Sequence, residues 1–393
     1  MKASDLHLAG RLKRHNDAVL TKLAYENAIN ANEPEWAEFS GSIVAGGPGG
    51  YDGYGEYVVV FDSGVDAHAP AIRENFKTGF SAVPSDLGRI CYRGGMTDSF
   101  FHGTAVAGVI LQMLPKVNII SVKVLNQKTG DADLAWWNVG LDKLHLWQER
   151  NGIYNVTINI SLGADCAAVN ADPRSLAEMD RFHDKLSMSI NNFGNYVVVA
   201  GGNEARIGSP ACYPACYTET IGVGSVLVGK LPGQDKFGIR LSDFSNTNQY
   251  IDYVALGEDF WTFIPNGAVK DIERMYAREL SFGAIKLKKI QYQHKDQWMV
   301  ELDGSSFGAP MMAAMVCGYV QEYKQGNGGD APSIDEVRDH FNAYSYKLTD
   351  KNGRVWRVPV MFNPDKTGLS RLVNRTGDEW TVPTDMGTQI EEI

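Results

Sequence analysis

Short, wholly apolar segments alternate with longer amphipathic segments along the middle of this chain, and this alternation limits the possible folds most strongly. The apolar segments are 57–61, 119–124, 156–160 and 196–200, and the intervening segments with helical spacing are 102–113, 132–150 and 173–190. Strands that are apolar on both faces need cover on both sides, and parallel strands need right-handed helical crossovers. We therefore predict an α/β fold of three layers, with a doubly wound, mainly parallel sheet and helices on both of its faces.

The chain divides into three predicted regions. Residues 1–55 are predicted to form an N-terminal arm, with a helix over 6–31 and a glycine-rich linker over 46–53. Residues 56–350 are predicted to form the main domain, and residues 351–393 a C-terminal extension of mostly β and irregular structure.

An insertion at 258–300 interrupts the main domain. It contains an expected helix at 271–280 and expected strands at 285–290 and 298–302, and a helix over 308–323 follows it. A capping box that begins at Ser333 marks the start of the last expected helix. A solvated hairpin is the favoured interpretation of the insertion, because surface insertions cost little free energy. The alternative is a lid or a partner-docking element beside the functional site.

Composition bears mainly on partners and location. The chain has a net charge of −10, which disfavours nucleic acid and anionic membranes as partners. Its apolar runs are all shorter than the roughly 18 residues of a membrane-spanning helix. The N-terminus lacks the apolar core of a secretion signal, so we expect a cytoplasmic location.

The cysteines are few and odd in number: Cys91, Cys166, Cys212, Cys216 and Cys317. Such a set is unlike the disulfide framework of a small secreted protein. Cys212 and Cys216 form a lone Cys-x3-Cys, which is weak evidence for a zinc site. We therefore expect unpaired thiols in a reducing compartment, no bound metal and no cofactor.

Four polar segments lie at predicted strand ends or helix starts, where ligands gather in α/β sheets. They are Asp62-Ser63-Gly64, His102-Gly103-Thr104, Gly201-Gly202-Asn203 and Gly304-Ser305-Ser306. Taken singly, each has an ordinary structural interpretation: a turn aspartate, a glycine-rich helix start, a glycine turn and an N-cap serine. Taken together, they supply a carboxylate, an imidazole, an amide and a hydroxyl, which are the groups that nucleophilic acyl transfer uses.

The order of Asp62, His102, Asn203 and Ser306 along the chain resembles that of the subtilisin-like serine peptidases, the subtilases. The resemblance covers about residues 57–320. Four further segments resemble the family: Val122 to Leu125 with Trp136, Ile158 to Gly163, Tyr213 to Gly224, and Leu241 to Asn246. The resemblance implies a subtilisin-like fold and a serine endopeptidase that works through an acyl-enzyme. We favour a selective intracellular processing protease.

The resemblance also assigns roles to individual residues. Ser306 would be the nucleophile, His102 the general base, and Asp62 the residue that orients His102. Asn203 and the backbone N–H of Ser306 would form the oxyanion hole. A polypeptide substrate would lie as an extended strand along the cleft. The implied substrate-binding residues are Ser161, Leu162, Gly163 and Gly130, with Ala200, Gly201 and Gly202 lining the pocket for the residue before the cut.

The chain departs from the family pattern in several places. The expected helix 102–113 continues without the calcium-binding loop that many relatives carry, so that calcium site is expected to be absent. Met311 follows Pro310 where the family usually has a histidine, and methionine fills space on a helix face readily. Pro310 is expected in the first turn of its helix. The arm at 1–55 is shorter than a secreted relative's prodomain, and it could block the cleft, bind a regulatory protein or pack on the surface, which is the preferred interpretation. The insertion could also bind a regulatory protein.

Three carboxylates flank the expected substrate strand: Asp131, Asp133 and Asp165. They could favour basic substrates, but ordinary surface charge is the preferred interpretation.

Two other functions stay open at this point. A catalytically silent subtilase-fold module would bind an extended peptide or a partner protein, although such a module need not keep all four polar groups. A sedolisin-type carboxyl peptidase would carry a glutamate base where this chain has His102.

Overall fold

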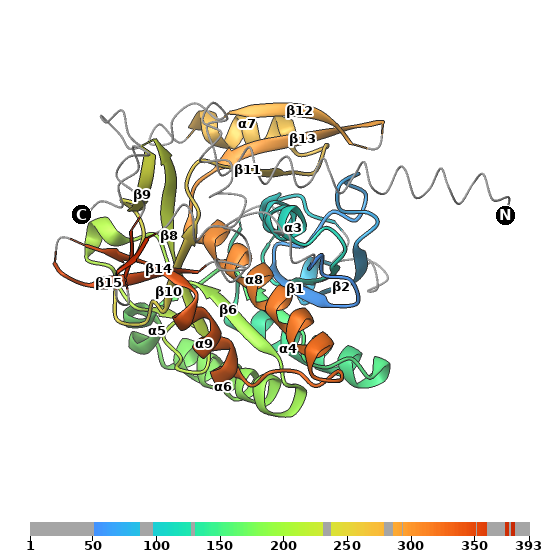
Figure 1. Ribbon diagram of the computed structural model, residues 1–393. Helices are drawn as coiled ribbons and strands as arrows, with labels where there is room; N and C mark the ends of the chain where they lie inside the picture. The colour runs from blue at the N-terminus through green and yellow to red at the C-terminus, as the bar shows by residue number, and fades with distance from the viewer. Residues whose placement is uncertain are drawn as a thin grey trace, which may run out of the picture.

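The structure of the chain is a computed structural model (Figure 1). It describes residues 51–86, 97–126, 130–230, 237–278, 286–292, 294–350, 352–359, 374–376 and 379–381. The expected helix at 6–31, most of the predicted arm and Cys91 lie outside the described residues.

A mainly parallel sheet forms the centre of the molecule (Figure 1). In the described residues its order is β10-β8-β6-β4-β1-β3-β2, with β9 antiparallel to β8. The strands are β1 (Tyr57–Asp62), β2 (Phe76–Ser81), β3 (Asn118–Lys123), β4 (Thr157–Ile160), β6 (Tyr196–Ala200), β8 (Ile221–Lys230), β9 (Phe237–Leu241) and β10 (Tyr253–Leu256). The four strands that the apolar segments predict are confirmed as β1, β3, β4 and β6.

Helices cover both faces of this sheet, and the side chains of β1 show why. Val58 and Val60 belong to one core, whereas Val59 and Phe61 belong to another. Successive side chains of a strand point to opposite faces, so a wholly apolar strand needs two cores. The first core includes α3 (His102–Met113) and α8 (Ser305–Gly326), and the second includes α4 (Leu134–Asn151) and α6 (Pro173–Phe193). The predicted three-layer α/β fold is confirmed.

Helix α8 begins earlier than the sequence predicts. The sequence predicts a start at residue 308, but the helix begins at Ser305, so Pro310 lies inside it and the expectation of a first-turn proline is wrong. Proline has no N–H, and the carbonyl four residues earlier, that of Ser306, therefore lacks its intrahelical donor. The hydroxyl of Ser161 donates to this carbonyl at 2.9 Å. A side chain from the end of β4 thus satisfies the group that the proline leaves free.

The insertion is a packed sheet rather than a solvated hairpin. It contains β11 (Phe260–Phe263), α7 (Val269–Arg278), β12 (Leu287–Tyr292) and β13 (Lys295–Leu302), with strand order β11-β13-β12 (Figure 1). Phe260 and Phe263 are 0% exposed. The Thr262 hydroxyl donates to the carbonyl of Ala105 in α3, and the Gln112 side chain donates to the carbonyl of Trp261. The favoured hairpin interpretation is therefore wrong for the inner side of the insertion, which packs on α3.

Two glycines let α3 approach its neighbours this closely. A Cβ on Gly103 would lie 2.0 Å from the carbonyl oxygen of Gly64, and a Cβ on Gly108 would lie 2.4 Å from the Thr262 hydroxyl oxygen. Real side chains do not tolerate such distances, so the helix needs glycine at both positions. The sequence-based expectation that these glycines allow close backbone contact is confirmed.

The last described part of the chain packs against the same core. Helix α9 (Ile334–Ala343) begins at the expected capping box, with Ser333 as its N-cap. Strands β14 (Ser345–Thr349) and β15 (Val355–Pro359) form an antiparallel hairpin, and β16 (Asn374–Thr376) pairs with β17 (Glu379–Thr381). The β14–β15 hairpin spans the predicted boundary at 350, and Trp356 in β15 belongs to the main core.

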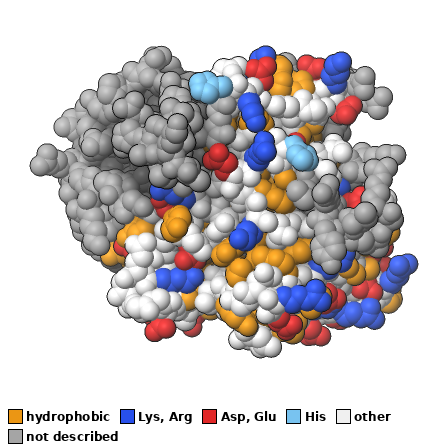
Figure 2. Space-filling view, turned by 90° about the vertical axis from the view of Figure 1, so that its right-hand side faces the viewer, with side chains coloured by type: hydrophobic (Ala, Val, Ile, Leu, Met, Phe, Trp, Pro, Cys, Tyr) orange, Lys and Arg blue, Asp and Glu red, His pale blue; other side chains and the backbone are white. Residues whose placement is uncertain are grey.

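The visible surface mixes charges of both signs. Figure 2 shows Lys, Arg, Asp and Glu side chains interspersed with apolar and uncharged ones over the described part of one face. This pattern agrees with a role of the charges in solubility. None of the described helices has the length and hydropathy of a membrane-spanning segment.

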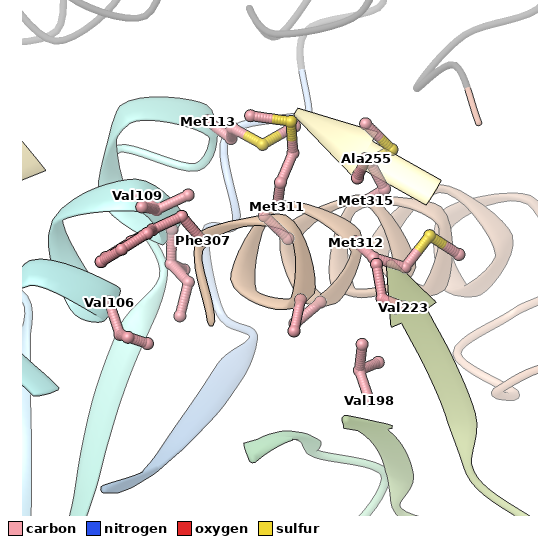
Figure 3. Packing of buried hydrophobic residues seen from close by; sticks show 14 of the residues in the cluster. Val106, Val109, Met113, Val198, Val223, Ala255, Phe307, Met311, Met312 and Met315 are labelled. Atoms are coloured by element: carbon pink, nitrogen blue, oxygen red, sulfur yellow. The ribbon is translucent and has the colours of Figure 1, made fainter. Parts of the chain in front are cut away.

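Helices α3 and α8 meet in a core rich in methionine (Figure 3). Val109 and Met113 of α3 lie near Phe307 and Met311 of α8, and Met312 lies near Val198 and Val223 of the sheet. Met311 is buried there, so the residue that replaces the family's histidine fills core space as the sequence suggests.

Truncating this core is expected to destabilise the protein. Met312 is 0% exposed, and Met312→Ala should lower the free energy of unfolding by about 2–5 kcal/mol, because it removes buried methylene groups and leaves a cavity. The matched control is Met188→Ala in α6, where the side chain is 37% exposed and a change within about 0.5 kcal/mol is expected. Urea unfolding followed by circular dichroism measures both. Equal effects of the two substitutions would contradict this packing.

Candidate active site

The four polar segments meet at one edge of the sheet. Asp62 is the last residue of β1, and Asn203 follows β6. His102 and Ser306 are the first and second residues of α3 and α8, respectively. Strands β1, β4 and β6 are consecutive neighbours and parallel, so their carboxyl ends share the edge where α/β proteins bind ligands.

Asp62 and His102 form the most defined pair of the site. His102 Nδ1 lies 2.9 Å from Asp62 Oδ1 and 3.0 Å from Oδ2. The Asp62 side chain is 0% exposed and that of His102 is 20% exposed. The backbone N–H of Ser63 donates to Asp62 Oδ1 at 2.6 Å. A carboxylate only accepts, so Nδ1 carries the proton and Nε2 of the neutral ring is free to act as a base.

The surroundings of His102 favour its protonated form. Burial of the ring opposes protonation, but the charge of Asp62 and its hydrogen bond outweigh burial, and Asp98 adds a further negative charge. Together they raise the pKa of His102 above the ordinary imidazole value of 6.5. A base with a raised pKa holds a proton more firmly once it has taken one from a nucleophile.

Ser306 is joined to the end of β4 by two reciprocal hydrogen bonds. Its hydroxyl donates to the carbonyl of Ser161 at 3.1 Å, and the Ser161 hydroxyl donates to the carbonyl of Ser306 at 2.9 Å. The neighbouring Phe307 ring lies 5.7 Å from the His102 ring, centroid to centroid. The start of α8 therefore touches both the end of β4 and the start of α3.

Asn203 is oriented by the start of α8. Its Oδ1 accepts the backbone N–H of Ser305 at 2.8 Å, and the backbone N–H of Gly202 donates to the Ser305 hydroxyl at 3.1 Å. Because a backbone N–H can only donate, the oxygen of the amide faces Ser305 and the NH₂ group points elsewhere. Asn203 is exposed, so this NH₂ group can donate to a bound ligand.

Most of the predicted substrate-binding residues lie at the carboxyl ends of two neighbouring strands, β4 and β6. Ser161-Leu162-Gly163 leads from β4 into β5 (Ala164–Asp165), which pairs with β7 (Cys212–Tyr213). On the other side, Ala200 ends β6, and the N–H of Gly201 donates to the carbonyl of Val223 at 2.8 Å. Gly130 is held separately, since its N–H donates to the carbonyl of Asn126 at 2.9 Å.

Several supporting residues were not assigned a role from the sequence. Asn246 donates to the carbonyl of Gly201 at 3.0 Å and accepts the N–H of Glu204 at 2.8 Å, so it fixes the turn that carries Asn203. Asp98 accepts hydrogen bonds from Ser63, which follows Asp62, and from Thr104, which lies two residues after His102. Neither residue was assigned a role from the sequence, because Asp98 joins the segments of Ser63 and Thr104, and Asn246 bonds to a turn about 45 residues away in the chain.

The other candidates have structural explanations. Asp133 and Asp165 accept backbone N–H groups as N-caps of α4 and of the short helix α5 (Cys166–Ala171). Cys166, Cys212, Cys216 and Cys317 are free thiols, with the sulfur atoms of Cys166 and Cys216 3.4 Å apart. In the part of the chain that the structure describes, no group of three or more His, Cys, Asp or Glu side chains is placed to hold a metal.

Comparisons with known proteins bear on the family and the fold of the chain. Residues 53–341 match the model of the subtilase family. The major intracellular serine protease of Bacillus subtilis is 29% identical over 221 residues, which are 53% of this chain and 60% of that protein. Subtilisin-like protease 3 of Trichophyton equinum is 26% identical over 260 residues, 61% of this chain and 55% of that protein. The chain thus spans no more than 60% of the length of either relative.

Solved structures show the same architecture. A cold adapted subtilisin-like serine proteinase superposes with a TM-score of 0.52 at 20% identity, covering 78% of this chain and 89% of the other. A lanthipeptide protease superposes with a TM-score of 0.54 at 18% identity, covering 76% of this chain and 82% of the other. At these identities the similarity bears on the fold alone.

The environment of His102 predicts its titration. Nuclear magnetic resonance of the histidine side chains should give His102 a pKa above 6.5, and Asp62→Asn should lower it, because burial then acts without the opposing carboxylate. His145 is the internal control. Its burial lowers its pKa to about 4, and Asp62→Asn should leave it unchanged. A His102 pKa that does not move in Asp62→Asn would contradict the pairing.

Proposed function

The chain belongs to the subtilase family, and on that premise we propose that it is a serine endopeptidase with Asp62, His102 and Ser306 as its catalytic triad. Asn203 would be the side-chain donor of the oxyanion hole. The observation that carries the proposal is the buried Asp62–His102 hydrogen bond, which lies at the same sheet edge as the start of α8. The bond leaves Nε2 as a base, and Ser306, the second residue of α8, is partly exposed.

Acylation would proceed by proton transfer from Ser306 to His102. The Ser306 hydroxyl, which donates to the Ser161 carbonyl in the free protein, turns to His102 Nε2 and attacks the substrate carbonyl carbon. Nε2 takes the hydroxyl proton and passes it to the leaving amine, while Asp62 stabilises the imidazolium. A water molecule then attacks the acyl-enzyme by the same route and restores the Ser306 hydroxyl.

The developing oxyanion would be bound by two donors. The NH₂ group of Asn203 is one, because its oxygen is already engaged by Ser305. The backbone N–H of Ser306 is the other, since it belongs to the first turn of α8, where N–H groups have no intrahelical acceptor. Donors that are fixed before the reaction stabilise the transition state without reorganisation.

The substrate would be a polypeptide in extended conformation. It would run along Ser161-Leu162-Gly163 with Gly130 on its other side, and the side chain before the cut would enter the pocket lined by Ala200, Gly201 and Gly202. Backbone hydrogen bonds supply affinity in this mode of recognition, and the pocket supplies selectivity.

We further propose that the protein is a selective processing protease in the cytoplasm. Its support is the similarity to relatives named as intracellular serine proteases and the insertion, which packs on α3. A regulatory protein would bind at the outer side of this insertion or at the arm 1–55.

The first test is covalent labelling of the nucleophile. A fluorophosphonate probe should add to Ser306, as located by mass spectrometry, and Ser306→Ala should abolish the adduct. Ser85→Ala, at an exposed serine away from α8, is the matched control and should keep labelling on Ser306. Absence of labelling in the folded full-length protein would favour a silent module that binds a peptide or a partner protein.

The second test concerns the oxyanion donor. Asn203→Ala should lower kcat for a peptide anilide that the wild type cleaves by about 10²–10³-fold, the loss known for removal of the side-chain donor in subtilisin, with little change in KM. Asn151→Ala, at the exposed end of α4, should leave both constants unchanged. A loss expressed mainly in KM would argue against an oxyanion role.

A further inference from the structure

Asp98 is a buried carboxylate that the proposed reaction does not use directly. It is 5% exposed and lies four residues before His102. Its Oδ1 accepts the hydroxyl of Ser63 at 2.9 Å. Its Oδ2 accepts the backbone N–H of Thr104 at 2.8 Å and the hydroxyl of Thr104 at 2.7 Å.

The directions of both hydroxyl protons are determined by other bonds. The Ser63 oxygen accepts the backbone N–H of Gly103 at 2.9 Å, and the Thr104 oxygen accepts the backbone N–H of Asp66 at 3.0 Å. Each hydroxyl proton is therefore left to point at Asp98. All three of these groups donate to Asp98, an arrangement that suits an ionised carboxylate, whose oxygens only accept.

These bonds join the two segments that carry the Asp62–His102 pair. Ser63 follows Asp62 directly, and its backbone N–H donates to Asp62 Oδ1. Gly103 and Thr104 follow His102 in the first turn of α3. We propose that Asp98 is a positioning residue that holds the end of β1 and the start of α3 at the separation at which Asp62 and His102 bond. This inference rests on the proposed function, in which that pair activates Ser306.

Asp98 is also coupled electrostatically to the Asp62–His102 pair. Burial raises the pKa of Asp98 to about 6, although the hydrogen bonds from Thr104 oppose this rise, and the nearby charge of Asp62 adds to it. The charge of Asp98 in turn contributes to the raised pKa of His102. Replacing Asp98 by a neutral group should therefore change both the geometry and the titration of His102.

The test variant is Asp98→Asn, which keeps the shape of the side chain but replaces one accepting oxygen with an NH₂ group, which cannot accept the bond that its partner donates. We expect the second-order rate of fluorophosphonate labelling at Ser306 to fall by about 10- to 100-fold, as misplacement of catalytic groups does. We also expect the His102 pKa measured by nuclear magnetic resonance to fall, and the acidic limb of the labelling rate to move to lower pH with it. Asp252→Asn is the control, because Asp252 accepts the N–H of Gly222 elsewhere on the sheet; labelling and pKa should stay at wild-type values.

A second variant separates position from charge. Ser63→Ala removes one bond to Asp98 but keeps its charge, so labelling should slow while the His102 pKa changes less than in Asp98→Asn. The inference is overturned if Asp98→Asn labels within twofold of the wild type. It is also overturned if the rate falls only in proportion to unfolded protein, with the His102 pKa unchanged. Failure of the wild type to label would instead refute the proposed function, and the pKa comparison would still decide the coupling of Asp98 to His102.

Discussion

The packing of α3 between the central sheet and the insertion determines where the candidate site can form. Residues 103–113 of this helix are buried, and Gly103 and Gly108 bring its backbone against Gly64 and β11. A helix confined on both sides cannot slide or tilt without opening a core at native density. His102 is its first residue, so the position of the imidazole follows from the position of the helix. Asp62 is the last residue of β1, which places its carboxylate within hydrogen-bonding distance of that imidazole.

The hydrogen bonds at the start of α8 satisfy a free backbone carbonyl and also position residues of the candidate site. Pro310 leaves the carbonyl of Ser306 without a helical donor, and the hydroxyl of Ser161 takes that place. The same two residues are joined by the hydroxyl of Ser306, while Ser305 orients Asn203. The candidate nucleophile, the candidate oxyanion donor and the end of β4 are therefore held by one set of hydrogen bonds, so a change at one of them is expected to affect the others.

The packing of the insertion against α3 indicates that it has a structural role. The sequence permits a solvated hairpin or a mobile lid, yet Thr262 bonds to Ala105 inside α3, and Phe260 and Phe263 have no exposed surface. A segment anchored in this way supports the helix that carries His102. Asp98 acts on the same helix from its N-terminal end, through Ser63 and Thr104. Support from two directions suits a site whose reactive groups must be aligned before substrate arrives.

The sequence by itself determined the layered α/β fold, because strands such as 57–61 are apolar on both faces and can be buried in few other ways. It also indicated Asp62, His102, Asn203 and Ser306 as candidate site residues, since each lies in a distinctive local segment and their order resembles that of a known family. Only the tertiary structure shows which groups Asp98, Asn246 and the insertion contact. It also shows that α8 begins at Ser305 and not at residue 308. Asp98 bonds to residues 35 and 6 positions away, and Asn246 to a residue 45 positions away. Hydrogen bonds between separate segments depend on how those segments pack, so local sequence patterns do not predict them.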